Sequence, residues 1–360
     1  MESFQAEQKM KKLLELIGQQ GASDLHLGVS RYPTLRIDGN LIPIAEEALL
    51  TPGDTVALAN ALMTPEQQAE FIENRELDFS YNFADKARFR VNVFMQRGYV
   101  SVTMRFVSSE IRSLEELNMP TSLYDFASFS QGLVLVVGPV GHGKSTTLAA
   151  LIDRINHTQD RHIITIEDPI EYVYTQDRCI INQREIGSDS KSFSQALRSA
   201  FREDANVLLL GELRDLDTIA TAMTAAETGH LVFATLHTND TAQTIDRITD
   251  VFPSHQQNQI KAQMANVLLG VISQRLLPII GGGRIPAVEI MIKNRAISTL
   301  IREGKSFQID SVIETNLREG MVSLDRSLAD LVQRNIVDIN ETYRYVKNMD
   351  YYRMILGEKE

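Results

Sequence analysis

Residues 132–146 read Gly132-Leu133-Val134-Leu135-Val136-Val137-Gly138-Pro139-Val140-Gly141-His142-Gly143-Lys144-Ser145-Thr146. The apolar run predicts a buried strand, and the residues from Lys144 onward open a predicted helix. Between them lies the pattern G-x-x-x-x-G-K-[ST], which is typical of a loop that holds phosphate groups. Its glycines let successive backbone N–H groups converge on one anion, and the helix start adds the positive end of its dipole. The segment therefore predicts a nucleoside triphosphate site.

The residues of this loop have separate expected roles. Lys144 is long enough to reach the outer phosphates, and the hydroxyl of Ser145 is a predicted ligand of Mg²⁺. A glycine turn that merely precedes a helix is the alternative, and the strand and helix on either side argue against it. The predicted phosphate-binding residues are Gly138, Gly141, His142, Gly143, Lys144, Ser145 and Thr146.

Composition limits the class of protein. The 360 residues are 43% hydrophobic and 23% charged, which favours a packed protein of about two domains. Cys179 is the single cysteine, so neither an intrachain disulfide nor a multi-cysteine zinc site can form. The net charge of −11 disfavours a nonspecific nucleic-acid binder. The polar residues 1–12 and the short apolar runs predict a cytoplasmic protein without a membrane span.

The pattern of apolar residues changes along the chain. Residues 1–107 combine alternating runs with a few helical stretches, which predicts an α+β domain with an antiparallel sheet. Residues 108–119 are more polar and form the expected linker. Residues 120–360 are predicted to form a doubly wound α/β domain whose last part, from about residue 296 to 360, is helical. The strands expected in it are 132–137, 162–166, 206–210 and 231–236, and the helices are 144–156, 192–202, 214–227, 241–249 and 255–277.

Three of these strands run into polar side chains. Ligands of open α/β sheets bind at the carboxyl ends of strands, so these side chains are candidate site residues. Glu167 is expected to orient or activate a water, although many strands simply end in polar residues. Glu212 follows an apolar run as in a Walker B segment, where aspartate is usual, and is expected near Mg²⁺. His237 ends the third strand and could equally be structural, and His230 before it has the weaker case.

Two arginines in the first domain form a separate candidate. Arg90 and Arg105 lie on the polar faces of two alternating runs. If Arg97 and Gly98 form a two-residue turn, the two arginines are directly opposite, an arrangement that destabilises a sheet unless an anion lies between or above them. The pattern alone favours two solvated arginines with acidic neighbours over an anion site.

Motifs along the chain together resemble a known family. The chain resembles the secretion ATPase superfamily, and within it the PilT-type retraction ATPases of type IV pili. Segment 295–303 is similar to the C-terminal Ala-Ile-Arg segment of that branch. The other motifs are the first-domain signature at 22–27, the Asp box at 164–172, the Walker B segment at 210–215 and the His box at 228–239.

The resemblance implies a RecA-like P-loop ATPase domain preceded by a PAS-like α+β domain, with ATP and Mg²⁺ bound. It implies that Glu167 is the catalytic glutamate and that Glu212 is the glutamate of the Walker B segment. His237 and His230 match the two His-box histidines. Arg90 and Arg105 match first-domain arginines that contact nucleotide phosphates, which reverses the preference drawn from their pattern alone.

The resemblance also implies partners. Such ATPases form homohexameric rings in the cytoplasm, peripheral to the inner membrane at the pilus base, where they act on a platform protein and can work with a paralogous pilus ATPase. Pilus extension and type II secretion ATPases are similar in the core but carry a tetracysteine zinc motif, which a chain with Cys179 alone lacks. An extension or secretion ATPase, a nucleic-acid translocase and a regulatory nucleotide-binding module are the alternatives.

Overall fold

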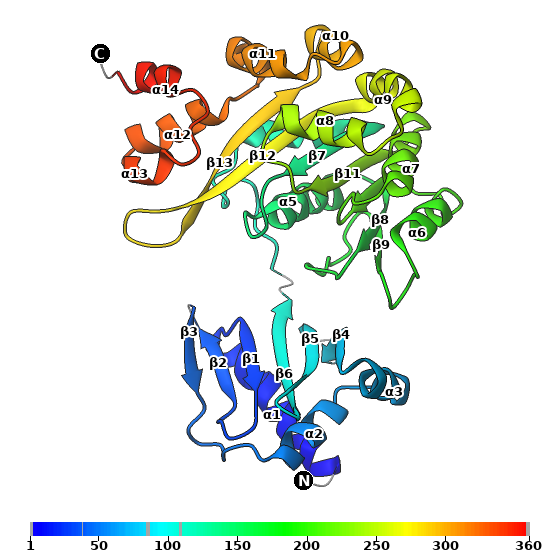
Figure 1. The fold of residues 1–360 in the computed structure, drawn as a ribbon, viewed down its shortest axis with the longest axis vertical. Coiled ribbons are helices and arrows are strands. Elements are labelled where there is room, and N and C mark those ends of the chain that lie inside the picture. Colours follow the sequence, from blue (N-terminus) through cyan, green and yellow to red (C-terminus); the bar gives the residue numbers. More distant parts are fainter. Residues whose placement is uncertain (1–2, 38, 84–86, 108–109, 358–360) are drawn as a thin grey trace. The chain divides into compact units, whose positions relative to one another are not determined.

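A computed structural model describes residues 3–37, 39–83, 87–107 and 110–357. Contacts divide the chain into two compact units (Figure 1). The first unit comprises Met1–Ser109 with Glu171–Val173, and the second comprises Glu110–Ile170 with Tyr174–Glu360. Ser108 and Ser109 of the expected linker lie outside the described residues.

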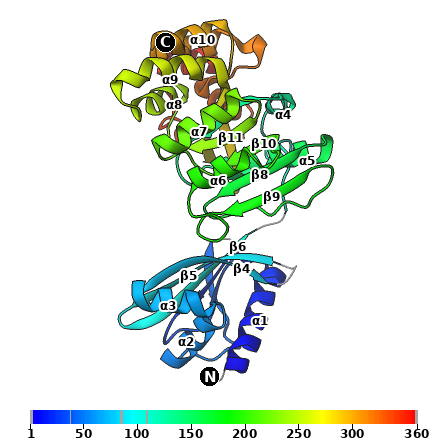
Figure 2. The ribbon, with the colours of Figure 1, turned by 90° about the vertical axis from the view of Figure 1, so that its right-hand side faces the viewer.

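The first unit is a sheet with helices on one face. Its described strands are all antiparallel, in the order β3-β2-β1-β6-β5-β4. Figure 2 shows the helices packed on one side of this sheet. The elements are α1 (Ser3–Gln20), β1 (Asp24–Leu27), β2 (Thr34–Ile37), β3 (Asn40–Pro43), α2 (Pro52–Asn60), α3 (Pro65–Asn74), β4 (Glu76–Phe83), β5 (Ala87–Gln96) and β6 (Tyr99–Val107).

Local sequence explains how these elements begin and pair. Thr51 and Thr64 each cap a helix whose first residue is proline, and a reciprocal capping box completes both caps. The turn between β5 and β6 has positive φ at Arg97 (50°) and Gly98 (82°), as a two-residue hairpin turn requires. This turn sets the register, and Arg90 lies directly opposite Arg105. The predicted pairing is confirmed.

The second unit carries the predicted parallel sheet. Its elements in chain order are η1 (Thr121–Tyr124), α4 (Asp125–Ser128), β7 (Gly132–Val137), α5 (Lys144–Thr158), β8 (His162–Glu167), β9 (Ile180–Glu185), α6 (Phe193–Ala200), β10 (Val207–Leu210), α7 (Leu216–Glu227), β11 (Leu231–Leu236), α8 (Thr241–Asp250), α9 (Ser254–Val267), β12 (Leu268–Pro278), β13 (Arg284–Ile292), α10 (Arg295–Glu303), η2 (Ser306–Gln308), α11 (Ile309–Thr315), η3 (Leu317–Glu319), α12 (Leu324–Gln333), α13 (Ile339–Thr342) and α14 (Met349–Leu356). Four predicted strands, β7, β8, β10 and β11, and four predicted helices, α5 to α8, agree with these bounds to within two residues.

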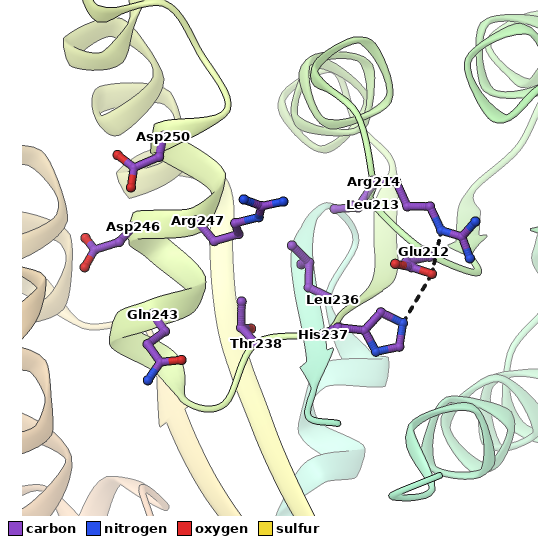
Figure 3. Close-up of a pocket in the computed structure, with 10 residues that line it drawn as sticks. All are labelled: Glu212, Leu213, Arg214, Leu236, His237, Thr238, Gln243, Asp246, Arg247 and Asp250. Carbon is purple, nitrogen blue, oxygen red and sulfur yellow. Dashed lines mark hydrogen bonds and ion pairs between the residues drawn. The ribbon is translucent and has the colours of Figure 1, made fainter. Parts of the chain in front are cut away.

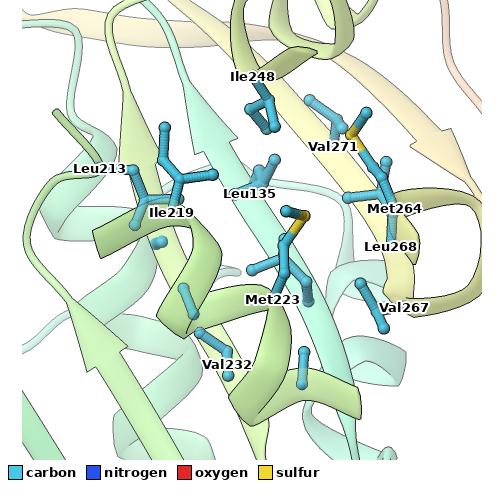
Figure 4. Close-up of a cluster of buried hydrophobic side chains, with 14 of the residues drawn as sticks. Leu135, Leu213, Ile219, Met223, Val232, Ile248, Met264, Val267, Leu268 and Val271 are labelled. Atoms are coloured by element: carbon cyan, nitrogen blue, oxygen red, sulfur yellow. The ribbon is translucent and has the colours of Figure 1, made fainter. Parts of the chain in front are cut away.

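The seven described strands of this sheet follow the order β13-β12-β7-β11-β10-β8-β9, and all neighbours are parallel except β12 and β13. Strands covered on both faces read as continuous apolar runs, as β7, β10 and β11 do. Figure 4 shows the core between the sheet and helices α7 to α9, where Leu135 of β7 meets Met223 and Met264. Because side chains alternate along a strand, Val134 and Val136 face the other side.

One predicted helix is wrong. The expected helix 255–277 ends at Val267, and the chain continues as β12 beside β7. An apolar run fits a helix and a buried strand equally well by periodicity, and here tertiary pairing decides. Gly270 allows the strand to pass close to its neighbours, and the β-branched Val271 and Ile272 that follow favour a strand. The glycines at 281–283 lie in the loop that connects β12 to β13.

The C-terminal helices pack on this hairpin. Side chains of α12 and α14 form a second apolar cluster with β12 and β13, in which Leu328 and Tyr352 are fully buried. Figure 1 shows α12 to α14 (orange to red) beside the β12–β13 hairpin (yellow). Among the described residues, none of the helices has the length and hydropathy needed to cross a bilayer.

We expect Gly270→Ala to destabilise the second unit, because the new methyl would lie 2.3 Å from Cζ of Phe126 and 2.8 Å from the carbonyl oxygen of Met291. Overpacking of this kind costs about 1–3 kcal/mol. The measurement is the thermal unfolding midpoint, which should fall by several degrees. Gly18→Ala in α1 is the control, since nothing lies within 4 Å of its added methyl. An unchanged midpoint for Gly270→Ala would contradict this account of β12.

Candidate nucleotide-binding site

Four parallel strands bring the predicted residues of the second unit to one edge of the sheet. The neighbours in space are β7, β11, β10 and β8, and all four run in the same direction. The loop 138–145 follows β7, His237 follows β11, Glu212 follows β10 and Glu167 ends β8. Residues far apart in the chain therefore lie in the spatial order loop, His237, Glu212, Glu167 at the carboxyl ends of the strands, where such sheets bind ligands.

The loop leads directly into the N-terminus of α5. Gly143 occupies the cap position with φ 82°, and no side chain of the described residues caps the helix there. The first N–H groups of such a helix have no partner within the helix and form a ready anion site. Ser145 and Thr146 lie half-buried in the first turn. The loop geometry thus fits a phosphate group.

The ammonium of Lys144 lies across its own loop. It donates to the carbonyl oxygens of Gly138 (2.9 Å) and Pro139 (3.1 Å) and to Nδ1 of His237 (3.2 Å). Because an ammonium can only donate, Nδ1 of His237 is the acceptor, and the ring proton lies on Nε2. Anionic oxygens accept more strongly than these neutral partners, so Lys144 is placed to exchange them for phosphate.

His237 connects the loop to the next strand end (Figure 3). Its Nε2 lies 3.3 Å from Oε2 of Glu212, and the same oxygen accepts from Nε of Arg214 at 2.8 Å. The hydrogen bond and the charge of Glu212 raise the pKa of Arg214. A cavity of about 550 Å³ borders Glu212 and His237 on one side and Gln243, Asp246, Arg247 and Asp250 of α8 on the other. Lys144, His237 and Glu212 form a continuous chain of contacts.

Glu167 is buried at the end of β8. Its Oε1 accepts from Oγ1 of Thr165 at 2.6 Å and from Nε2 of Gln183 at 3.5 Å. The backbone N–H of Gly211 donates to the carbonyl of Ile166, which fixes the end of β8 beside the end of β10. Glu167 at the end of β8 and Glu212 after β10 therefore lie on adjacent strands. The hydroxyl of Thr165 orients the carboxylate of Glu167.

Oxygen ligands for Mg²⁺ are present at this edge of the sheet. Ser145, which carries a hydroxyl, lies in the first turn of α5, and Glu212, which carries a carboxylate, follows β10. Hydroxyl and carboxylate oxygens suit this hard cation, which keeps several waters and phosphate oxygens among its ligands. The residues present therefore fit a magnesium-bound nucleotide.

His142 is held against β12. Its Nδ1 accepts from the N–H of Leu276 at 2.9 Å, and its ring meets that of Tyr345 edge to face at 6.4 Å. Burial lowers the pKa of His142, and the nearby cations Arg275 and Lys144 lower it further. The side chain thus fastens the outer part of the loop to the sheet.

The structure does not bring His230 to the loop of its own chain. His230 precedes β11, at the end of that strand opposite His237. Its Nδ1 lies 3.1 Å from the carbonyl oxygen of Ala225, and its ring packs on Phe201. A strand of this length separates the two histidines by roughly 20 Å.

The two arginines of the first unit belong to a longer row. Adjacent strands place Arg36, Asp24, Arg105 and Arg90 side by side across β2, β1, β6 and β5. Asp24 is 3% exposed and pairs with Nε of Arg105 (2.9 Å) and of Arg36 (3.8 Å). Arg90 has the exposed Asp78 at 4.0 Å. The acidic neighbours expected from the pattern are present, and the row carries more positive than negative charge.

Sequence reasoning missed three residues at this site. Ser273, Gln274 and Arg275 of β12 are buried and contact the loop or the segment after β11. They fell inside the wrongly predicted helix. Three consecutive polar residues in an otherwise apolar run were the available signal.

Comparisons with known proteins identify relatives of the chain. Residues 2–284 match the family described as Type II/IV secretion system protein. The chain is 46% identical over 331 residues to the type IV pilus retractation ATPase PilT of Pseudomonas aeruginosa. The matched residues are 91% of this chain and 94% of that protein. It is 33% identical over 349 residues to the type IV pilus ATPase PilU of the same organism, covering 97% and 91%. A crystal structure of the pilus retraction motor PilT with bound ADP has a TM-score of 0.89 at 43% identity, over 95% of this chain and 98% of that chain.

We expect His142 to make stability depend on pH. Its lowered pKa means that the unfolded chain binds a proton more readily than the folded one, so stability is complete above pH 6.5 and is lost as the pH falls below it. His142→Gln removes this contribution. The thermal midpoint, measured between pH 7.5 and 5.5, should fall less for His142→Gln than for the wild type. His255→Gln, at an exposed histidine, is the control, and equal falls in all three proteins would contradict the expectation.

Proposed function

The chain belongs to the type II/IV secretion system protein family, and we propose that within this family it is the motor ATPase that powers retraction of type IV pili. One observation carries the proposal: Lys144, His237 and Glu212 lie in contact at the edge of a P-loop sheet. The similarity to PilT extends over most of both chains and is greater than the similarity to PilU, which supports retraction as the work performed.

ATP is the proposed substrate. The N–H groups of the loop and of the first turn of α5 bind its phosphates, and Lys144 leaves the carbonyls of Gly138 and Pro139 to bind the outer ones. Glu167 accepts a proton from the water that attacks the γ-phosphorus, while Thr165 holds the carboxylate in place. The bond between the γ-phosphorus and the bridging oxygen then breaks, which gives ADP and inorganic phosphate.

Ser145 and Glu212 are the proposed protein contributions to Mg²⁺ binding. When bound, the cation would supply positive charge that stabilises the phosphates. The Nε2–H of His237 faces Glu212 and orients this carboxylate, so His237 has a positioning role. Because Nδ1 of His237 also contacts Lys144, a shift of Lys144 toward the phosphates would remove one of the two partners of the ring.

Arg90 and Arg105 are the proposed charge-neutralising groups from the first unit. They lie on an exposed sheet face, with side-chain exposures of 50% and 67%, and are available to a ligand. We propose that these arginines contact the phosphates of bound ATP. Arginines supplied in this way make hydrolysis depend on how the units close. Closure around ATP and reopening after hydrolysis would then be the mechanical output.

The proposed assembly is a homohexameric ring in the cytoplasm, peripheral to the inner membrane at the pilus base. Its proposed partners are the platform protein of the pilus and a paralogous pilus ATPase. His230, remote from the loop of its own chain, is assigned no catalytic step. A net charge of −11 argues against nucleic acid as the partner.

We expect Glu167→Gln to reduce ATP turnover by a factor of about 10² to 10⁴, because the amide cannot accept the proton from water. The oxygen that accepts from Thr165 is kept, so ADP affinity should be unchanged. Steady-state phosphate release measures turnover. In a deletion strain of the source organism, the wild-type gene should restore twitching motility and Glu167→Gln should not.

Glu203→Gln is the matched control, since Glu203 pairs with Arg184 at 3.0 Å outside the predicted site. Equal turnover of Glu167→Gln and wild type would remove Glu167 from catalysis. A wild-type protein without turnover would refute the ATPase assignment. An active wild type that leaves twitching unrestored would refute the role in retraction alone.

We expect Arg90→Ala to lower turnover at least tenfold, since a phosphate-contacting arginine is worth about 10³ to 10⁵ in rate. Its neighbour Asp78 is exposed, so the fold should be unaffected. Arg105→Ala should lower turnover similarly but also lower the thermal midpoint, because Asp24 is buried and loses the shorter of its two ion pairs. Arg31→Ala in the same unit is the control. Wild-type turnover in both variants would exclude the arginine row from the site.

A further inference from the structure

Three consecutive polar residues are buried in β12 beside the phosphate loop. Ser273, Gln274 and Arg275 are 1%, 2% and 5% exposed. Because side chains alternate along a strand, Gln274 points to one face of the sheet and its two neighbours to the other. Buried polar side chains are costly unless they are hydrogen-bonded, so the partners of these three indicate what they do.

Gln274 fastens the loop to helix α5. Its Nε2 donates to the carbonyl oxygen of His142 at 2.6 Å, and its Oε1 accepts from Oγ1 of Thr147 at 2.9 Å. A loop that turns its N–H groups toward a phosphate must turn carbonyls outward, and these need donors. Lys144 donates to two such carbonyls, those of Gly138 and Pro139, but its ammonium is required at the phosphates. The neutral amide of Gln274 has no such second task.

Two glycines of the loop pack directly on Gln274. A Cβ at Gly138 would lie 2.6 Å from the carbonyl oxygen of Gln274, and a Cβ at Gly143 would lie 3.0 Å from its Nε2. The loop backbone therefore lies so close to β12 at Gly138 and Gly143 that neither position has room for a side chain. Gln274 is in contact with the loop at its start, its middle and its end.

The neighbours of Gln274 hold the segment after β11. Oγ of Ser273 donates to the carbonyl oxygen of Asn239 at 2.8 Å, and Nη2 of Arg275 donates to the same oxygen at 2.7 Å. Asn239 is two residues beyond His237. Nη1 of Arg275 also donates to the backbone carbonyl of Gln274 at 2.9 Å. The triplet therefore fixes the phosphate loop relative to the segment that carries His237.

We propose that Gln274 is a positioning residue for nucleotide phosphates, which acts by holding the carbonyl of His142 outward and thereby the N–H groups of the loop inward. This role rests on the proposed ATPase function. It predicts that loss of the Gln274 amide weakens binding of the phosphate chain. The rate at saturating ATP should change little, because the side chains that act in hydrolysis are still present.

The test compares Gln274→Met with the wild-type chain by calorimetric titration with ADP and by steady-state kinetics. Methionine has a similar length but forms neither hydrogen bond. A buried polar group deprived of its partner corresponds to a loss of about tenfold in affinity. We expect ADP to bind about tenfold more weakly and KM for ATP to rise by a similar factor, with kcat within about threefold. A merely structural role would lower the thermal midpoint without this split between KM and kcat.

Gln257→Met is the matched control, because Gln257 donates to a backbone carbonyl, that of Phe252 at 3.1 Å, in α9. It should leave ADP affinity unchanged. Thr147→Val removes only the hydroxyl that orients Oε1 of Gln274, and should weaken ADP binding by a smaller factor. In the double variant the losses should combine to less than their product, since both act through one contact.

A folded Gln274→Met that binds ADP as tightly as the wild type would overturn the proposal. If Gln274→Met fails to fold, Thr147→Val decides, and wild-type ADP affinity in that variant would overturn it. Failure of the wild type to bind ADP would instead overturn the proposed ATPase function, so the two failures are distinguishable.

Discussion

The parallel pairing of β7, β11, β10 and β8 is the constraint on which the site depends. Parallel strands place all their carboxyl ends at one edge, so residues separated by dozens of positions meet there without any long loop. The pairing also explains the spatial order, in which His237 lies between the loop and Glu212 although it follows both in the chain. An antiparallel strand in the middle of this sheet would have sent its carboxyl end to the far edge.

The second constraint is the polarity of the loop backbone. N–H groups that converge on an anion leave carbonyls on the outside of the loop, and these carbonyls need hydrogen-bond donors of their own. Two donors of different character do this: the ammonium of Lys144 and the amide of Gln274. The charged donor can exchange a carbonyl for phosphate, and the neutral donor keeps the loop in shape while it does so. Gln274 thus maintains the conformation of the loop, and Lys144 responds to the bound phosphate.

How far the sequence predicts the site depends on whether the determining signal is local. The loop, the strand ends at Glu167, Glu212 and His237, and the Arg90–Arg105 register all follow from short patterns: a glycine motif, apolar runs and a two-residue turn. The strand β12 does not, because its apolar run is compatible with a helix until the edge of β7 is available to pair with it. Gln274 was missed for this reason. The pairing of Arg105 with Asp24 was missed because 81 residues separate them.

Asp24 changes how the arginine row should be understood. Like charges opposite one another destabilise a sheet, and a buried carboxylate between Arg36 and Arg105 offsets that repulsion within the fold. Arg90 has no comparably buried partner among the described residues, since Asp78 is exposed at 4.0 Å. The ion pair with Asp24 therefore offsets much of the positive charge of Arg105. The positive charge of Arg90 is offset less by its exposed neighbour and can act on a ligand. The two arginines lie opposite one another in the same hairpin, but their environments differ. Arg90 is therefore the better candidate for a purely functional role, whereas Arg105 has a structural role as well.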